Sequence, residues 1–232
     1  MADDDHQRAP AKLTLSLRVT GVRDDGYHLL DAEMVTLDLA DELAFSSGDG
    51  LEVVAEGMAA PALPAEEDNL VRRALALVGR RAHVRLLKRI PPGGGLGGGS
   101  ADAAAVLRWA GVDVAGPEEL AAAATLGADV PFCLLGGRAR VRGIGEVVEP
   151  LPPTPRSLVL LLPPLSVSTA AVYRAWDHLG GPTADGPNDL EPAALAVEPR
   201  LGPWRDLLGE ATGRQPVLAG SGSSWFVPGT PA

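Results

Sequence analysis

The stretch Ile90-Pro91-Pro92-Gly93-Gly94-Gly95-Leu96-Gly97-Gly98-Gly99-Ser100-Ala101-Asp102-Ala103-Ala104 decides the fold of this chain, because it joins a predicted strand to a predicted helix. Residues 82–90, at its start, partly alternate apolar and polar side chains, as a half-buried strand does. Residues 101–110 are rich in alanine and predict a helix with Ser100 as its N-cap. A glycine loop in this position predicts a phosphate-binding loop, because its bare backbone N–H groups can close on an anion and the helix start adds partial positive charge.

Other kinds of glycine-rich segment fit this stretch less well. A flexible linker is usually polar and does not run into an alanine-rich helix. Gly93, Gly95 and Gly98 satisfy the dinucleotide pattern G-x-G-x-x-G, but no clear second strand ends at the acidic residues of 113–119. The P-loop pattern needs a lysine directly after the glycines, and none follows here. The local pattern therefore favours phosphate binding and leaves the kind of loop open.

Composition excludes several classes of function. The net charge of −10 argues against a nucleic-acid-binding surface. The single cysteine, Cys133, excludes an internal disulfide, fits a reducing cytosol and lies in an apolar segment typical of a core. The sequence contains no run of about 18 apolar residues, so it predicts no membrane span. Residues 1–10 are polar and acidic, so we expect a flexible tail rather than a signal peptide, and a cytoplasmic protein.

Only two of the twenty basic residues are lysines. Lys12 lies in residues 11–17, which alternate cleanly, so Lys12, Thr14 and Ser16 share one face of a strand. That face is either a solvated surface or a site that uses the lysine. Lys88 precedes the glycine loop, and we expect it to face solvent.

The rest of the chain predicts an α+β protein of two domains without internal repeats. The Pro-rich segment 150–155 is the best linker, so we expect an N-terminal domain over 11–151 and a C-terminal domain over 152–232. A second glycine-serine loop occupies 219–224. We expect strands at 11–19, 33–39, 51–56, 138–142 and 157–162, and helices at 69–81, 101–110, 117–126 and 169–179.

Seven segments carry a resemblance to a known superfamily. They are residues 11–15, 25–28, 91–104, 126–132, 143–146, 188–191 and 219–224. Together they resemble the GHMP kinases, and Asp25-Gly26-Tyr27-His28 resembles one family within them, the 4-(cytidine 5′-diphospho)-2-C-methyl-D-erythritol kinases of non-mevalonate isoprenoid biosynthesis. The chain departs from that family in two respects. Thr14 stands where the family commonly has asparagine, and the chain stops soon after the third motif, so we expect a shortened C-terminal domain.

The resemblance implies an ATP- and Mg²⁺-dependent kinase that phosphorylates the 2-hydroxyl of the methylerythritol unit of a cytidine diphosphate substrate, without nucleic acid or membrane. Lys12 and Asp129 would be the catalytic pair. Thr14, Tyr27, His28 and Tyr173 would bind substrate, with cytosine stacked between the two tyrosines and His28 at its edge. The loop around the ATP phosphates would comprise Pro91, Pro92, Gly93, Gly94, Gly95, Leu96, Gly97, Gly98, Gly99, Ser100 and Ala101.

Three alternatives remain at this point. Another small-molecule GHMP kinase, such as a homoserine or mevalonate kinase, would share the loop but not Tyr27-His28. A catalytically weak nucleotide-binding relative would fit Thr14 and the early end of the chain. A dinucleotide-binding oxidoreductase would rest on the glycine pattern alone.

Overall fold

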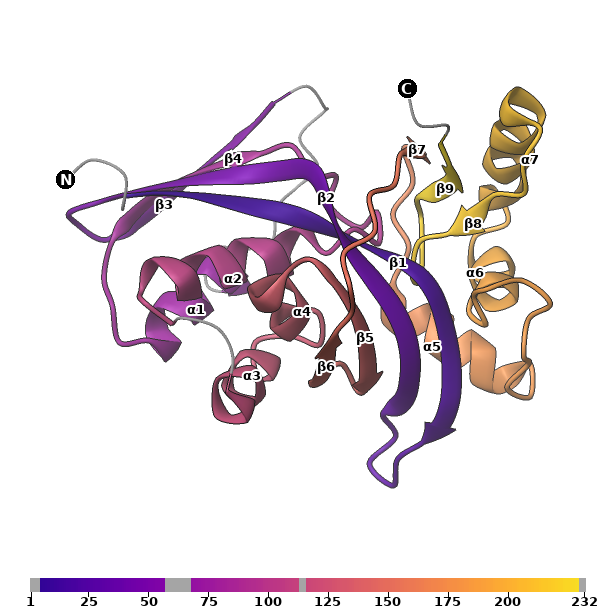
Figure 1. Ribbon diagram of the computed structural model, residues 1–232, viewed down its shortest axis with the longest axis horizontal. Helices are drawn as coiled ribbons and strands as arrows, with labels where there is room; N and C mark the ends of the chain where they lie inside the picture. Colours follow the sequence, from indigo (N-terminus) through magenta and orange to yellow (C-terminus); the bar gives the residue numbers. More distant parts are fainter. Residues whose placement is uncertain (1–4, 57–67, 113–115, 230–232) are drawn as a thin grey trace.

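The computed structural model describes residues 5–56, 68–112 and 116–229, and it confirms the predicted α+β class (Figure 1). The larger sheet has the strand order β3-β4-β2-β5-β6, with β1 paired to β2, and the smaller sheet has the order β7-β9-β8. The strands are β1 His6–Val22, β2 His28–Ser46, β3 Gly50–Ala55, β4 His83–Lys88, β5 Arg138–Gly143, β6 Val147–Pro150, β7 Leu158–Leu161, β8 Val217–Leu218 and β9 Trp225–Pro228. The helices are α1 Leu70–Leu77, α2 Gly98–Trp109, α3 Pro117–Ala124, α4 Val130–Leu135, α5 Thr169–His178, α6 Glu191–Val197 and α7 Leu201–Thr212.

The long antiparallel hairpin of β1 and β2 runs along the larger sheet and reaches the half of the molecule that contains β7 to β9 (Figure 1). β1 begins at His6, so the prediction of a flexible tail over residues 1–10 is wrong for His6 to Pro10. Those residues pair with Ala44 to Ala40 of β2, and Ala9 is fully buried. The hydrogen bonds between β1 and β2 and the burial of Ala9 hold residues 6–10 in the sheet, although their polar composition is typical of a flexible tail.

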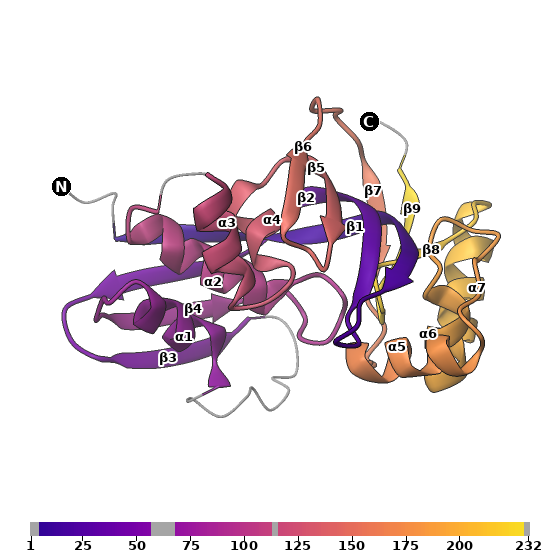
Figure 2. The ribbon, with the colours of Figure 1, turned by 90° about the horizontal axis from the view of Figure 1, so that it is seen from below.

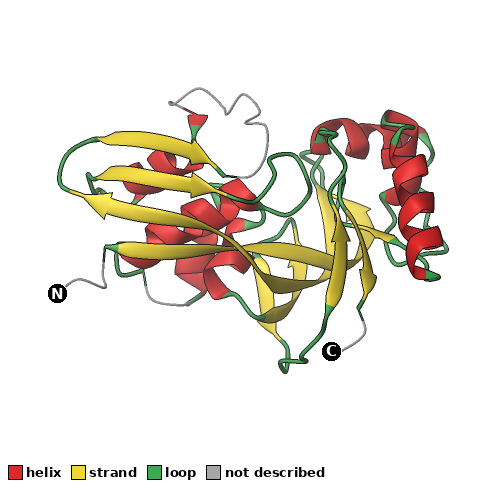
Figure 3. Cartoon of the chain, turned by 90° about the horizontal axis from the view of Figure 1, so that it is seen from above, coloured by secondary structure: helices red, strands yellow, loops and turns green. Residues whose placement is uncertain are grey.

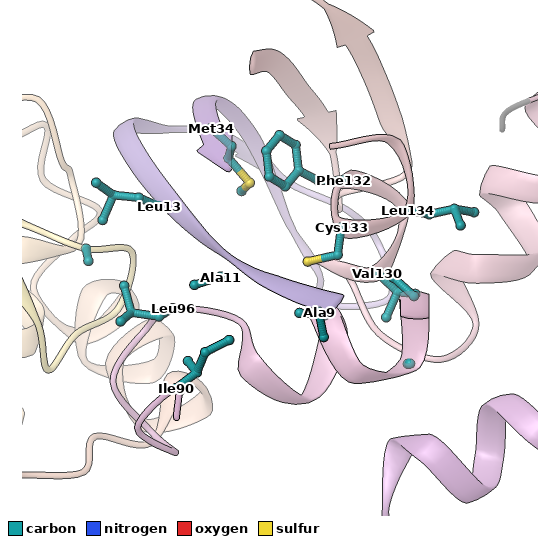
Figure 4. Close-up of a cluster of buried hydrophobic side chains, with 14 of the residues drawn as sticks. Ala9, Ala11, Leu13, Met34, Ile90, Leu96, Val130, Phe132, Cys133 and Leu134 are labelled. Atoms are coloured by element: carbon teal, nitrogen blue, oxygen red, sulfur yellow. The ribbon is translucent and has the colours of Figure 1, made fainter. Parts of the chain in front are cut away.

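Helices α1 to α4 lie together beside the larger sheet, as Figure 2 and Figure 3 show. α2 packs against β1, α1 and α4, and its alanines allow this close approach because their side chains occupy little volume. Figure 4 shows the adjoining core, in which Leu13 of β1, Leu96 of the glycine loop and Phe132 of α4 are buried. The base of the glycine loop is thus part of the main core.

The smaller sheet and helices α5 to α7 form the other half of the molecule, and β1 is tied to it directly (Figure 1). Leu17 forms a bridge with Asn188. The carboxylate of Asp189 accepts hydrogen bonds from the backbone of Val19 at 3.0 Å and from the Arg18 side chain at 2.6 Å. In the sequence, the strands of the larger sheet precede the Pro-rich segment 150–155 and those of the smaller sheet follow it. The domain boundary at residues 151/152 stays a prediction.

Four helices differ from expectation, one in its start and three in their existence. α2 begins at Gly98 with Gly97 as its N-cap, so Ser100 is not the cap; Gly97 has a left-handed backbone with φ of 67° and turns the chain into the helix. α4, α6 and α7 were not predicted at all. Among the described residues, no helix is long and apolar enough to cross a membrane.

Candidate active site

A cleft of about 900 Å³ lies between the two halves of the molecule. Its wall takes residues from β1, the hairpin tip, the glycine loop, the start of α4, helix α5 and the 219–224 loop. Of the residues predicted to form the site, Ala101 alone does not line the cleft, because it is buried in α2. The residues that do are Lys12, Thr14, Tyr27, His28, Pro91, Pro92, Gly93, Gly94, Gly95, Leu96, Gly97, Gly98, Gly99, Ser100, Asp129 and Tyr173.

At two positions the glycine loop approaches its neighbours more closely than a side chain would allow. A Cβ on Gly95 would lie 2.3 Å from the carbonyl oxygen of Ala219 and 2.7 Å from that of Gly222. A Cβ on Gly97 would lie 2.7 Å from Cγ of Lys12. Both glycines have positive φ, which side chains disfavour. The loop therefore packs tightly against the 219–224 loop on one side and against Lys12 on the other.

The helix that follows the loop supplies donors for an anion. Gly98, Gly99 and Ser100 form the first turn of α2 and line the cleft. An α-helix leaves the N–H groups of its first turn without intrahelical partners, and its dipole is positive at this end. Loop and helix start together have the chemistry of a phosphate site.

Lys12 brings positive charge to the centre of the cleft. Its ammonium lies 3.2 Å from Oδ2 of Asp129 and donates to Oγ1 of Thr14 at 3.2 Å. Lys12 is 5% exposed, whereas the Asp129 side chain is 31% exposed. The backbone N–H of Lys12 also donates to the carbonyl of Leu96 at 3.0 Å, which fixes β1 to the glycine loop. Lys12 and Thr14 on this face of β1 are thus buried and line the cleft, so the face is not a solvated surface there.

Asp129 lies at the N-terminus of the short helix α4, at a position whose local sequence alone favours a turn residue over a catalytic one. Its side chain makes no capping hydrogen bond to the helix, so its carboxylate remains available to the cleft and to Lys12. The helix behind it is buried from Val130 to Leu134, and this anchors the aspartate.

Aromatic rings form the other end of the cleft. The ring of His28, at the start of β2, stacks on Tyr173 of α5 with centroids 4.6 Å apart, and it meets the edge of Trp176 at 5.5 Å. Nε2 of His28 is hydrogen-bonded to Oδ1 of Asp177 at 2.8 Å. Tyr27 is 59% exposed and lies beneath the guanidinium of Arg23.

Both tyrosines thus line one cleft, but His28 lies over the ring of Tyr173 and not at the edge of the pocket as expected. Burial, and to a smaller extent the charge of Asp129, raises the pKa of Tyr173, so this phenol stays neutral at physiological pH. Stacking of a base between Tyr27 and Tyr173 stays a prediction.

Lys88 does not face solvent, and this prediction is wrong. It is buried and pairs with Asp41 of β2 and with Asp102 of α2, the latter at 2.7 Å. Burial lowers the pKa of Lys88, but the charges of Asp102 and Asp41 raise it by more, so the ammonium stays charged. Sequence reasoning missed this cluster because Asp41 and Asp102 carry no local signal of pairing; the one hint was the rarity of lysine in the chain.

Comparison with known proteins identifies relatives of the chain. Residues 69–137 match the family model of the GHMP kinases N terminal domain. The chain is 42% identical to the 4-diphosphocytidyl-2-C-methyl-D-erythritol kinase of Paracoccus denitrificans, over 95% of this chain and 86% of that protein. It is 41% identical to the kinase of the same name from Ruegeria pomeroyi, over 94% and 86%.

Solved structures give the same result for the fold. A crystal structure of 4-(cytidine 5′-diphospho)-2C-methyl-D-erythritol kinase superposes with a TM-score of 0.74 at 37% identity, covering 95% of this chain and 88% of the other. A homoserine kinase from Cytophaga hutchinsonii superposes with a TM-score of 0.57 at 20% identity, covering 99% and 87%, and shows the shared fold alone.

Proposed function

We propose that this chain, which belongs to the 4-diphosphocytidyl-2-C-methyl-D-erythritol kinase family of the GHMP kinases, phosphorylates the 2-hydroxyl of 4-(cytidine 5′-diphospho)-2-C-methyl-D-erythritol. As a member of that family it is a kinase that uses ATP. The observation that carries this proposal is the placement of the Lys12–Asp129 pair between the glycine loop and the aromatic end of the same cleft. A phosphate donor at one end and a base at the other would bring their reacting groups to this pair.

In the proposed mechanism the oxygen of the 2-hydroxyl attacks the γ-phosphorus of ATP, and the bond to the β,γ-bridging oxygen breaks to release ADP. Phosphoryl transfer depends on positioning and on charge stabilisation more than on covalent catalysis. Asp129 would orient the hydroxyl and accept its proton, which then passes to solvent. Lys12 would stabilise negative charge on the transferred phosphoryl group, and its buried position strengthens that interaction.

The glycine loop would hold the ATP phosphates through backbone N–H groups of the loop and of the first turn of α2. Thr14 accepts a hydrogen bond from Lys12, so it would support the lysine in addition to contacting the substrate. A threonine hydroxyl can both donate and accept, which preserves part of the hydrogen-bonding capacity of the asparagine that the family commonly has here.

Mg²⁺ would enter with ATP and neutralise charge on the phosphates when bound. Among the described residues, no group of three or more His, Cys, Asp or Glu side chains is placed to hold a metal ion. In phosphoryl-transfer sites Mg²⁺ keeps several waters and binds substrate phosphates with few protein ligands. The donor set of the cleft fits a Mg²⁺ held mainly by phosphate oxygens and waters, and we assign it no protein ligand.

The cytidine end would be held by Tyr27, His28 and Tyr173. Base–aromatic stacking contributes about 1–3 kcal/mol per base. Because Nε2 of His28 is engaged by Asp177, recognition of the base edge by the ring would fall to its other nitrogen, Nδ1.

The test is a phosphorylation assay with Mg²⁺-ATP and the cytidine diphosphate methylerythritol substrate, run beside homoserine and mevalonate. We expect transfer to the cytidine substrate alone, and almost none by an Asp129→Asn variant that still binds ATP. Turnover of homoserine or mevalonate in place of the cytidine substrate would refute the specificity, and near-normal turnover by Asp129→Asn would refute the role of the aspartate.

A further inference from the structure

We propose that Asp41, Lys88 and Asp102 form a positioning cluster that holds both ends of the glycine loop, and that ATP binding depends on the protonation of Asp102. The inference rests on the proposed function, since it takes the ligand of the loop to be ATP. None of the three residues belongs to the catalytic pair or to the aromatic end of the cleft.

The start of the loop is held by Asp41 of β2, which is fully buried. Its Oδ1 accepts the backbone N–H of Arg89 at 2.5 Å and that of Ile90 at 2.8 Å, and its Oδ2 pairs with Lys88. Ile90 directly precedes Pro91, the first residue of the loop. One carboxylate on a neighbouring strand therefore fixes the backbone where the loop begins.

The end of the loop is held through Lys88, the last residue of β4. Its ammonium donates to Oδ2 of Asp102 in α2 at 2.7 Å. The same ammonium lies 3.2 Å from the position of a Cβ on Gly98, the first residue of α2. Residues 91–97 form no helix or strand between these two points. The ion cluster therefore holds the loop at both ends, in addition to the hydrogen bond between Leu96 and Lys12 and the packing of Gly95 on the 219–224 loop.

The charge of the cluster can change near neutral pH. Oδ1 of Asp102 is buried and has no hydrogen-bond partner among the described residues, so half of this carboxylate is unsatisfied. Burial raises the pKa of Asp102 to about 7, although the charge of Lys88 opposes that rise. The cluster of two carboxylates and one ammonium is therefore neutral when Asp102 is protonated and carries one negative charge when it is ionised.

That charge would act on ATP because Lys88 and Asp102 line the cleft beside the loop. Among the residues that the structure describes, three groups face Asp102: Lys88 from β4, Asp41 from β2 and the thiol of Cys133 from α4. Burial raises the pKa of that thiol far enough to keep it neutral. Ionised Asp102 thus adds a negative charge that only Lys88 offsets, next to a site for polyanionic phosphates. ATP should bind the protonated form more tightly.

The first experiment measures the Kd for ATP of the full chain by calorimetry at about pH 6 and about pH 8.5, on either side of this pKa. Asp102→Asn keeps the shape of the side chain and removes its charge. Relative to the wild type, we expect Asp102→Asn to bind ATP with similar affinity at the lower pH and up to about tenfold more tightly at the higher pH, equivalent to 1.4 kcal/mol.

The matched control is Glu33→Gln. It also removes a carboxylate from an ion pair of β2, since Glu33 accepts from Arg138 at 2.8 Å, but Glu33 does not line the cleft. It should follow the wild type at both pH values, and the ionisation of ATP itself is common to all three proteins. Equal pH profiles for Asp102→Asn and the wild type would overturn the proton linkage.

The second experiment tests positioning with Asp41→Asn, which replaces one acceptor oxygen of Asp41 by a donor. We expect the Kd for ATP to rise by about tenfold or more, with the KM of the cytidine substrate unchanged. A folded Asp41→Asn with wild-type affinity for ATP would overturn the positioning role. If Asp41→Asn does not fold, Asp41 supports the whole fold and a role specific to the loop is overturned, while the Asp102→Asn profile still decides the proton linkage. In either case, a wild type that binds ATP and phosphorylates its substrate leaves the proposed function standing.

Discussion

Replacing Gly97 by alanine should disable the enzyme by displacing the side chain of Lys12, although neither catalytic residue is itself substituted. The backbone of Gly97 has φ of 67°, and an L-residue in that left-handed conformation costs about 1–2 kcal/mol. Its new methyl group would start 2.7 Å from Cγ and 3.1 Å from Cε of Lys12. Because ordinary carbon contacts are about 3.5–4.0 Å, the lysine side chain would have to move by roughly 1 Å.

Such a movement would break the geometry that places the ammonium 3.2 Å from both Asp129 and Thr14. A misplacement of about 1 Å can cost about a hundredfold in rate. We therefore expect kcat of Gly97→Ala to fall by about that factor, together with a loss of about 1–3 kcal/mol in the free energy of unfolding. Steady-state kinetics and urea unfolding of the same preparation measure both quantities.

Gly79→Ala separates backbone strain from the collision. Gly79 has nearly the same φ, 63°, but a Cβ there would meet no atom within 4 Å, and the residue does not line the cleft. It should lose about 1–2 kcal/mol of stability and keep its turnover. If Gly97→Ala lost stability like Gly79→Ala and kept its kcat within about threefold, the claim that the loop holds Lys12 in place would be wrong.

Four further outcomes follow from the contacts described. Lys12→Ala should lose most turnover while ATP still binds, as transfer assays and calorimetry can show. Tyr27→Phe should be mild, whereas Tyr27→Ala should weaken binding of the cytidine substrate by about 1–3 kcal/mol and leave ATP binding unchanged. Asp177→Ala should raise the KM of the cytidine substrate more than it lowers kcat, because it frees Nε2 of His28; an unchanged KM would show that the pair has no part in binding. The pKa of Asp102 is about 7 in the folded protein, which is above its value in the unfolded chain. The protonated carboxyl therefore stabilises the fold fully below about pH 4, and this contribution is lost as the pH rises through 7. Over that interval the melting temperature of Asp102→Asn should rise relative to that of the wild type.

The glycine loop could be predicted from sequence because its chemistry is local. Strand, glycine run and helix are adjacent in the chain, and the anion-binding property belongs to the backbone itself. The helix start was misplaced by three residues for an equally physical reason. Ser100 has the chemistry of an N-cap, but Gly97 turns the chain earlier, and its position is set by contact with Lys12 across the fold.

Errors elsewhere came from pairing between distant segments. Residues 6–10 read as a tail because nothing in their composition announces the strand that pairs with them. Lys88 read as a solvent-facing residue because its partners lie 47 and 14 positions away, on β2 and α2. A buried lysine between two carboxylates can be recognised only when the register of β2 against β4 is known.

At the aromatic end of the cleft, helical spacing predicts which residues of α5 share a face but not which ring packs against them. Tyr173, Trp176 and Asp177 are spaced i, i+3 and i+4, so they share one face of α5, and that much could be read from the sequence. The ring that this face holds is His28, 149 positions before Asp177, and only the hairpin of β1 and β2 delivers it. The same hairpin is tied to the C-terminal half by the hydrogen bonds of Asp189 to β1. The position of the His28 and Tyr173 rings, against which a base would bind, is therefore set by where the hairpin meets α5. A substitution that removed the hydrogen bonds between β1 and Asp189 would shift the stacking of His28 on Tyr173 without changing either residue.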